Sequence, residues 1–188
     1  MNESGGMAAE ELVLPGCQSI TALSASDPRG HFTKVFSANQ SDALLLGEVF
    51  YTVSALGVLR GMHLQEPPYA QHKLVFCLSG IAYDVLVDLR VGSPTYGGLY
   101  ETVLSPSNGT ALLVAPGVAH GFMALDDETI MIYCTTSVHA AESDRGVHWT
   151  TVGASWPMEP TVVSERDRAL PALADYRSPF RFQHGAGR

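Results

Sequence analysis

Short apolar segments separated by glycine and proline run through most of this chain, and this pattern restricts its fold more than any other feature. The clearest segment is residues 81–90, where apolar side chains stand at every second position. A period of two is typical of a β-strand with one face in a core. We expect the other face to carry Asp84 and Asp88. The sequence therefore predicts an all-β protein.

Three pairs of neighbouring segments share this pattern and are joined by turn residues. Gly80 ends one segment, and the pair Asn108-Gly109 separates two others. Glycine and asparagine adopt the positive φ angles that tight turns need, so we expect hairpins. The expected pairs are residues 73–80 with 81–90, Leu99–Leu104 with 111–115, and 121–125 with Thr129–Thr135. About ten strands would then form a sandwich or barrel.

Helix is predicted only outside these sheets. Short helices are expected over residues 41–46, which precede a glycine, and over residues 164–173, where Ser164 suits the N-cap. Both chain ends, residues 1–10 and 182–188, are expected to fray.

The length and charge of the chain limit its organisation and partners. A chain of 188 residues fits one domain, which we predict to span residues 1–188 with its core at about 27–150. The net charge of -8 repels a nucleic-acid backbone, so no nucleic-acid partner is expected. Any phosphate-bearing ligand should be small and held by a few local cations.

The cysteines and the N-terminal segment indicate a cytoplasmic protein. Three cysteines without C-x-x-C spacing argue against a disulfide framework or a zinc–thiolate site, so we expect reduced thiols. No signal-peptide pattern or apolar run of membrane-spanning length is present in the sequence. We therefore expect a soluble protein with no membrane partner.

Charged side chains in the predicted strands indicate a polar cavity. Arg60, His63 and Lys73 are poor fillers for a dry barrel interior. Arg60 and His63 are three residues apart, so a regular strand would point them to opposite faces. A bulge at Gly61 would bring them to the same face.

Each polar residue taken singly also has a structural interpretation. A lone histidine on a strand, such as His63 or His120, is more often a hydrogen-bonded structural residue than a catalyst. Tyr133 would usually be a core residue with a satisfied hydroxyl, and Lys73 would usually reach the surface. Only the combination of these residues favours a catalytic site.

Several motifs stand in unbroken order along the chain. They are Asp27-Pro-Arg-Gly30, Gly57-Val-Leu-Arg-Gly-Met-His-Leu-Gln65, Lys73-Leu-Val, residues 84–97, Pro116-Gly-Val-Ala-His-Gly-Phe122, Tyr133-Cys-Thr-Thr136, Arg145-Gly-Val-His-Trp149 and, more weakly, Ser164-Glu-Arg-Asp167. Together they resemble the dTDP-4-dehydrorhamnose 3,5-epimerase family. The resemblance implies a cupin-like β jelly roll with a few short peripheral helices, which forms a homodimer. It also implies a nucleotide-linked 4-keto-6-deoxyhexose as substrate and no cofactor or metal.

The resemblance implies a role for each polar residue of the predicted cavity. His63 matches the base that removes a proton next to the 4-keto group, and Tyr133 matches the acid that returns one from the other face. Lys73 matches the cation that stabilises the enolate. Arg60 matches a diphosphate-binding residue, and His120 matches another ligand contact.

Asp167 matches the carboxylate that orients the catalytic histidine of the family. It also stands three residues after Ser164, where it could simply support the start of a helix. Asp84 is the alternative partner for His63. Asp144 and Arg166 are further expected substrate contacts.

The departures from the family pattern gather at positions that contact the nucleotide. Arg29 is kept, but Lys34 replaces a usual glutamate, residues 48–50 replace a Gln-x-Asn segment, and Val138 and His139 replace a tyrosine pair. We expect Arg29, Lys34 and His139 to contact the substrate. The changes suggest that the nucleobase or the sugar differs from the usual one, as in a CDP- or GDP-linked keto sugar. Whether C3, C5 or both are inverted stays open.

Two other functions compete with an epimerase. A metal-dependent cupin is one alternative, because His63, His72 and His120 fall in places typical of that signature, although the expected His-x-His and following glutamate are missing. A non-catalytic sugar-nucleotide-binding cupin is the other. Retention of both His63 and Tyr133 speaks against it.

Overall fold

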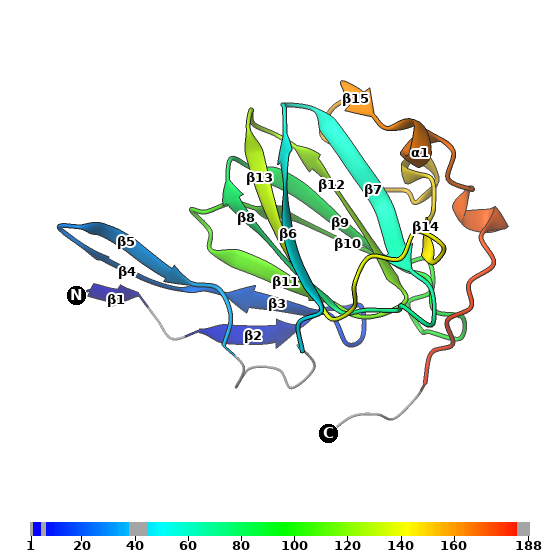
Figure 1. The fold of residues 1–188 in the computed structure, drawn as a ribbon, viewed down its shortest axis with the longest axis horizontal. Coiled ribbons are helices and arrows are strands. Elements are labelled where there is room, and N and C mark those ends of the chain that lie inside the picture. Colours follow the sequence, from blue (N-terminus) through cyan, green and yellow to red (C-terminus); the bar gives the residue numbers. More distant parts are fainter. Residues whose placement is uncertain (1, 5–6, 38–44, 184–188) are drawn as a thin grey trace.

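The computed structural model describes residues 2–4, 7–37 and 45–183 of the chain. Two six-stranded sheets face each other, and a smaller three-stranded sheet projects from them (Figure 1). The first large sheet has the order β10 (Leu99–Leu104), β9 (Ala82–Asp88), β12 (Val118–Ala124), β7 (Val58–Gln65) and β14 (Asp144–Gly146), with β15 (Val162–Val163) parallel to β7. The all-β prediction is confirmed.

The second large sheet supplies the opposite wall of the sandwich. Its order is β2 (Ala8–Glu11), β3 (Gln18–Thr21), β11 (Thr110–Val114), β8 (Lys73–Ser79), β13 (Thr129–Thr135) and β6 (Glu48–Ser54). The small sheet consists of β1 (Asn2–Ser4), β4 (Leu23–Asp27) and β5 (Gly30–Lys34). Within the N-terminal segment that we expect to fray, residues 2–4 and 8–10 instead belong to β1 and β2.

The main core lies between the two large sheets. Leu86 and Phe122 from the first sheet and Leu112 and Met131 from the second are all fully buried in one cluster. Burial of such side chains contributes about 1.5–3 kcal/mol each. This packing fixes the separation of the sheets, and with it the width of any cavity at their open end.

The three expected hairpins are wrong, because in each pair the two strands lie in different large sheets. β8 pairs with β11 and β13, whereas β9 pairs with β10 and β12. The connections β8–β9, β10–β11 and β12–β13 therefore cross from one sheet to the other. An alternating strand buries its apolar face equally well in either arrangement, so the pattern could not distinguish them.

Strand β9 also differs from its expected two-faced pattern. Asp84 and Asp88 are fully buried, so the face that carries them belongs to the interior as well. Each carboxylate has a buried partner: Asp84 contacts His120, and Asp88 contacts Arg90. These pairs remove the cost of burying a charge alone.

Among the residues that the structure describes, helical structure is confined to short segments. Of the helix predicted at residues 164–173, only α1 (Glu165–Arg168) is α-helical, with Ser164 as its N-cap. Pro171, which cannot continue a helix, follows soon after it. The described residues also include two 3-10 turns, η2 (Trp149–Thr151) and η3 (Leu173–Asp175). The expected helix at residues 41–46 lies largely outside the described residues. Within the described ranges, no helix is long and apolar enough to cross a membrane.

Candidate active site

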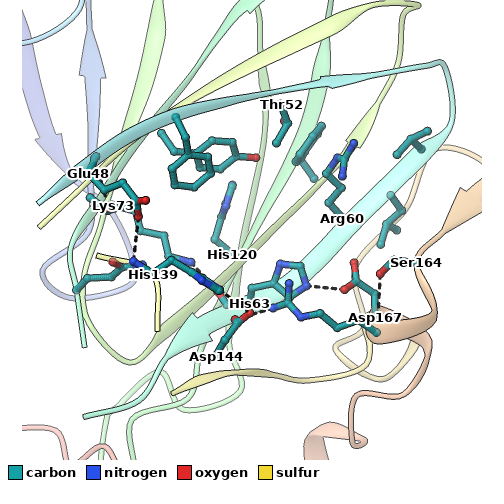
Figure 2. A pocket seen from close by; sticks show the side chains of 18 of the residues that line it. Glu48, Thr52, Arg60, His63, Lys73, His120, His139, Asp144, Ser164 and Asp167 are labelled. Carbon is teal, nitrogen blue, oxygen red and sulfur yellow. Dashed lines mark hydrogen bonds and ion pairs between the residues drawn. The ribbon is translucent and has the colours of Figure 1, made fainter. Parts of the chain in front are cut away.

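A cavity of about 810 Å³ opens between the two large sheets. Strands β6, β8 and β13 line one wall, and β7 and β12 line the other, while α1 and the chain around His139 complete the rim (Figure 2). Its size is in the range of small-molecule sites. The predicted site residues that line it are Arg60, His63, Lys73, His120, Tyr133, His139, Asp144, Arg166 and Asp167.

A β-bulge in β7 brings Arg60 and His63 to the same cavity. His63 pairs with His120 and Arg60 pairs with Phe122, so two residues of β7 stand opposite Gly121 alone. Gly61 has a φ of 141°, and a Cβ there would lie 2.5 Å from the Cα of Gly121. The predicted bulge at Gly61 is therefore confirmed, and it depends on close backbone contact that only glycine allows.

His63 and Asp167 form a hydrogen-bonded pair in the cavity wall. His63 Nε2 lies 2.7 Å from Asp167 Oδ1, and the side chains are 21% and 4% exposed. The other carboxylate oxygen accepts the N–H of Gly61 at 3.1 Å. Because a carboxylate only accepts, Nε2 carries the proton and Nδ1 keeps a free lone pair.

Asp167 makes the contacts that both of its interpretations require. Its backbone N–H donates to Ser164 Oγ at 3.1 Å, as at a helix start, while its carboxylate faces His63. Burial alone would raise the pKa of Asp167, but the bonds from His63 and Gly61 outweigh burial and lower it. Burial lowers the pKa of His63 in spite of Asp167, so the imidazole is neutral near pH 7.

Asp84, the alternative partner of His63, binds another histidine. Its Oδ2 lies 2.7 Å from His120 Nε2, and these two side chains are 0% and 4% exposed. The ring of His120 meets the ring of Tyr133 edge-on, with centroids 6.0 Å apart. His120 thus lines the cavity next to Tyr133, with Asp84 buried behind it.

Tyr133 lies on the wall opposite His63. It belongs to β13, in the second large sheet, and only 8% of it is exposed. Burial raises its pKa, and the negative charge of Asp84 raises it further. The phenol is therefore protonated throughout the neutral range and can act only as a proton donor at first.

Lys73 places a cation between the walls. Its Nζ donates to the backbone oxygen of His63 at 3.0 Å, and burial lowers its pKa to about 8. The charge of Asp144 opposes that shift. At the other end of the cavity, Arg60 Nε donates to Ser54 Oγ at 3.0 Å, which holds the guanidinium in place.

Charged side chains form the rim of the cavity. Arg166 donates to Asp144 Oδ1 at 2.6 Å, and His139 Nε2 lies 3.4 Å from Asp144 Oδ2. The backbone N–H of His139 donates to the carboxylate of Glu48 at 2.9 Å. The rim therefore offers both positive and negative groups to a ligand (Figure 2).

Two predicted residues do not reach this cavity. Arg29 and Lys34 lie on the projecting hairpin of β4 and β5, and Arg29 pairs with Asp27. The cavity is lined without them.

Sequence reasoning missed Thr52 on β6 and named Glu48 and Phe50 only through the departure of residues 48–50 from the family pattern. Glu48, Phe50 and Thr52 all line the cavity, because alternate residues of a strand share a face. That spacing was visible in the sequence. Gln71 was missed as well; its buried Oε1 finds no hydrogen-bond partner in the described part of the chain, so it can accept from a ligand.

A metal site of the cupin type has no ligand set in the part of the chain that the structure describes. No group of three or more histidine, cysteine or carboxylate side chains is arranged there to hold an ion. His63 and His120 each bind a different carboxylate. The three cysteines are unpaired.

Comparison with known proteins gives consistent matches. A family model described as dTDP-4-dehydrorhamnose 3,5-epimerase matches residues 11–175. The dTDP-4-dehydrorhamnose 3,5-epimerase of Sinorhizobium fredii is 42% identical over 166 residues, 84% of each chain.

Solved structures agree with this match. A 3,5-epimerase of Legionella pneumophila in complex with dTDP-4-keto-L-rhamnose has a TM-score of 0.89 and 29% identity, over 95% of this chain and 100% of that chain. A 3'-monoepimerase of Streptomyces bikiniensis in complex with dTDP-quinovose has a TM-score of 0.82 and 31% identity, over 87% of each chain. The sandwich is thus the cupin-like fold, and the chain belongs to the dTDP-4-dehydrorhamnose 3,5-epimerase family.

Proposed function

We propose that this protein is a nucleotide-sugar epimerase that inverts C3, C5 or both in a dTDP-4-keto-6-deoxyhexose. The observation that carries the proposal is the placement of His63 and Tyr133 on opposite walls of one cavity, on β7 and β13. Inversion needs a base on one face of the sugar and an acid on the other. A site that only bound the ligand would not need this opposition.

The proposed reaction uses these two residues in turn. His63 Nδ1 takes the proton from the carbon next to the C4 carbonyl, and the electron pair moves onto the carbonyl oxygen as an enolate. The enolate then takes the Tyr133 hydroxyl proton on its opposite face and re-forms the carbonyl. Solvent removes the proton from His63 and returns one to the tyrosinate, so the enzyme regains its starting state.

Asp167 and Lys73 support the two charged stages. Asp167 holds the His63 tautomer and stabilises the imidazolium that forms. Lys73 supplies the charge that stabilises the enolate oxygen. Arg60 is proposed to bind the diphosphate, and His120, His139, Asp144 and Arg166 are proposed as further substrate contacts.

Turnover of dTDP-4-keto-6-deoxyglucose, followed by NMR, tests the proposed function. We expect new ring coupling constants that identify inversion at C3, at C5 or at both. A purified protein that leaves the sugar unchanged would contradict the proposal.

We propose dTDP as the nucleotide, in line with the ligands of the related structures, although Lys34 and His139 suggested another base. Calorimetry with dTDP, CDP and GDP tests this choice. We expect dTDP to bind most tightly. Tighter binding of CDP or GDP would show that the changed positions select another base.

We also propose that the protein is a homodimer of one-domain chains. Strand β6 is an edge strand whose outward side chains Val49, Tyr51 and Val53 are 58%, 65% and 49% exposed. Such an apolar edge is usually covered. In a dimer, the projecting β4–β5 hairpin could carry Arg29 and Lys34 to the partner's cavity. The unpaired cysteines suit the reducing cytoplasm, where we expect the enzyme to act.

A further inference from the structure

Tyr133 is held by a second aromatic ring that the proposed reaction does not use. Phe50 of β6 stands directly opposite Tyr133 of β13 in the strand register. Their ring centroids are 4.8 Å apart and the planes differ by 9°, so the rings are stacked. Phe50 also lines the cavity and is 43% exposed.

The phenol of Tyr133 thus contacts rings on two sides. Phe50 covers its face, and His120 meets it edge-on with centroids 6.0 Å apart. Asp84 fixes His120 by a 2.7 Å hydrogen bond. His120 and Asp84 belong to the buried interior, whereas Phe50 stands on an edge strand. Phe50 is therefore the part of this clamp that can change without opening the core.

The position of the phenol decides the fate of the enolate. The enolate can take a proton from Tyr133, which inverts the carbon, or from the imidazolium of His63, which restores the original configuration. Proton transfer requires donor and carbon at roughly 3–3.5 Å, and a displacement of about 1 Å can cost about 10²-fold in rate. A mobile Tyr133 phenol would protonate the enolate more slowly than the imidazolium of His63 does, so retention would dominate.

We propose that Phe50 is a positioning residue that fixes the Tyr133 ring for protonation and so directs the enolate to inversion rather than return. This inference rests on the proposed epimerase function. Phe50 acts through Tyr133 and need not touch the reacting carbon. This positioning role also explains why an aromatic side chain occupies this pocket-facing position on β6.

The test compares Phe50→Leu with wild-type protein on dTDP-4-keto-6-deoxyglucose in D2O. NMR at early times measures deuterium incorporated with inversion and deuterium incorporated with retention. We expect total exchange to stay within about twofold, because His63 is unchanged, while the inversion-to-retention ratio falls at least about tenfold. Phe50→Tyr keeps a stacking ring, so its inversion-to-retention ratio should stay at the wild-type value.

Two further variants control for folding. Val103 is also an exposed apolar residue on an edge strand, at 41%, but lies in the other sheet, on β10, so Val103→Ala should leave the ratio unchanged. Phe50→Met also removes the ring and serves as the second variant if Phe50→Leu melts at a reduced temperature. It should lower the inversion-to-retention ratio in the same way. A wild-type ratio in a folded Phe50→Leu or Phe50→Met protein, or an equal fall of exchange and inversion, would overturn the inference. Failure of the proposed function itself is distinct, since wild-type protein would then show no exchange.

Discussion

At the scale of single residues, burial decides which of two similar pairs can act as the base. His63–Asp167 and His120–Asp84 have the same 2.7 Å separation. The His63 side chain is 21% exposed, while that of His120 is 4% exposed. This greater exposure supports the proposed role of His63 as the base, because the base must exchange protons with a ligand and then with solvent.

The pH dependence of kcat/KM follows from two pKa shifts in the site. Protonated His63 cannot act as a base, so activity falls on the acid side, below the usual histidine value of 6.5, because its pKa is lowered. Deprotonated Lys73 loses its charge, so activity also falls above about pH 8. Tyr133 cannot cause this second limb, since its pKa is raised. A pH profile should show both limbs.

Lys73→Arg tests the origin of the alkaline limb. Arginine keeps its charge up to about pH 12, so the limb should move upward even if the plateau is lower. A limb that persists near pH 8 in this variant would assign it to another group.

Asp167→Asn should lower kcat by about 10²-fold or more, because the amide neither fixes the His63 tautomer nor stabilises the imidazolium. Steady-state kinetics measures this, and circular dichroism checks the fold. Glu165→Gln is the matched control, as Glu165 is exposed on the same helix. Equal activities of the two variants would leave Asp167 only its role at the helix start.

Most of the polar residues that line the cavity could be predicted from sequence, but their pairing could not. Asp167 is 104 residues from His63, and Asp84 was an equal candidate until the fold placed it beside His120. Long-range pairing depends on strand order, which local patterns do not encode. Arg29 and Lys34 show the same limit, because they lie on a projecting hairpin.

At the scale of elements, one bulge builds the site. A regular β7 would turn either Arg60 or His63 away from the cavity, and Gly61 prevents this by its contact with Gly121. The bulge was predictable because two residues three positions apart on a regular strand point to opposite faces. An extra residue between them is needed to bring both to the same face. The crossing of strands between sheets was not, because either arrangement buries the same faces.

Gly61→Ala should destabilise the protein by about 2 kcal/mol or more, since it combines a positive φ with a 2.5 Å backbone contact. Gly92 is the matched control, as its φ is 85° with nothing within 4 Å of an added Cβ. Gly92→Ala should cost only about 1 kcal/mol. Urea unfolding measures both; equal losses would mean that the close approach adds nothing.

At the scale of the whole molecule, the acidic chain concentrates cations in the cavity where we propose that a diphosphate binds. The net charge is -8, yet Arg60, Lys73 and Arg166 all line one cavity. The composition predicted a small phosphate ligand held by a few local cations, and the cavity contains such a set. The composition could not reveal that the outer edge of this cavity wall, strand β6, is apolar.

The proposed dimer should depend on that edge. Sedimentation of wild-type protein at micromolar concentration should give a dimer, and Tyr51→Asp should weaken it at least about tenfold, because it buries a charge in an apolar interface. Val103→Asp, on the other sheet, should have no effect. A monomeric wild-type protein would contradict the proposal.

Solvent deuterium exchange into the 4-keto sugar tests most directly whether His63 and Tyr133 act from opposite faces. The wild-type protein should incorporate deuterium at C3, C5 or both with inversion. His63→Ala should lose exchange by about 10³-fold, whereas Tyr133→Phe should still exchange but with retention. Wild-type exchange in His63→Ala, or full inversion in Tyr133→Phe, would contradict this division of roles.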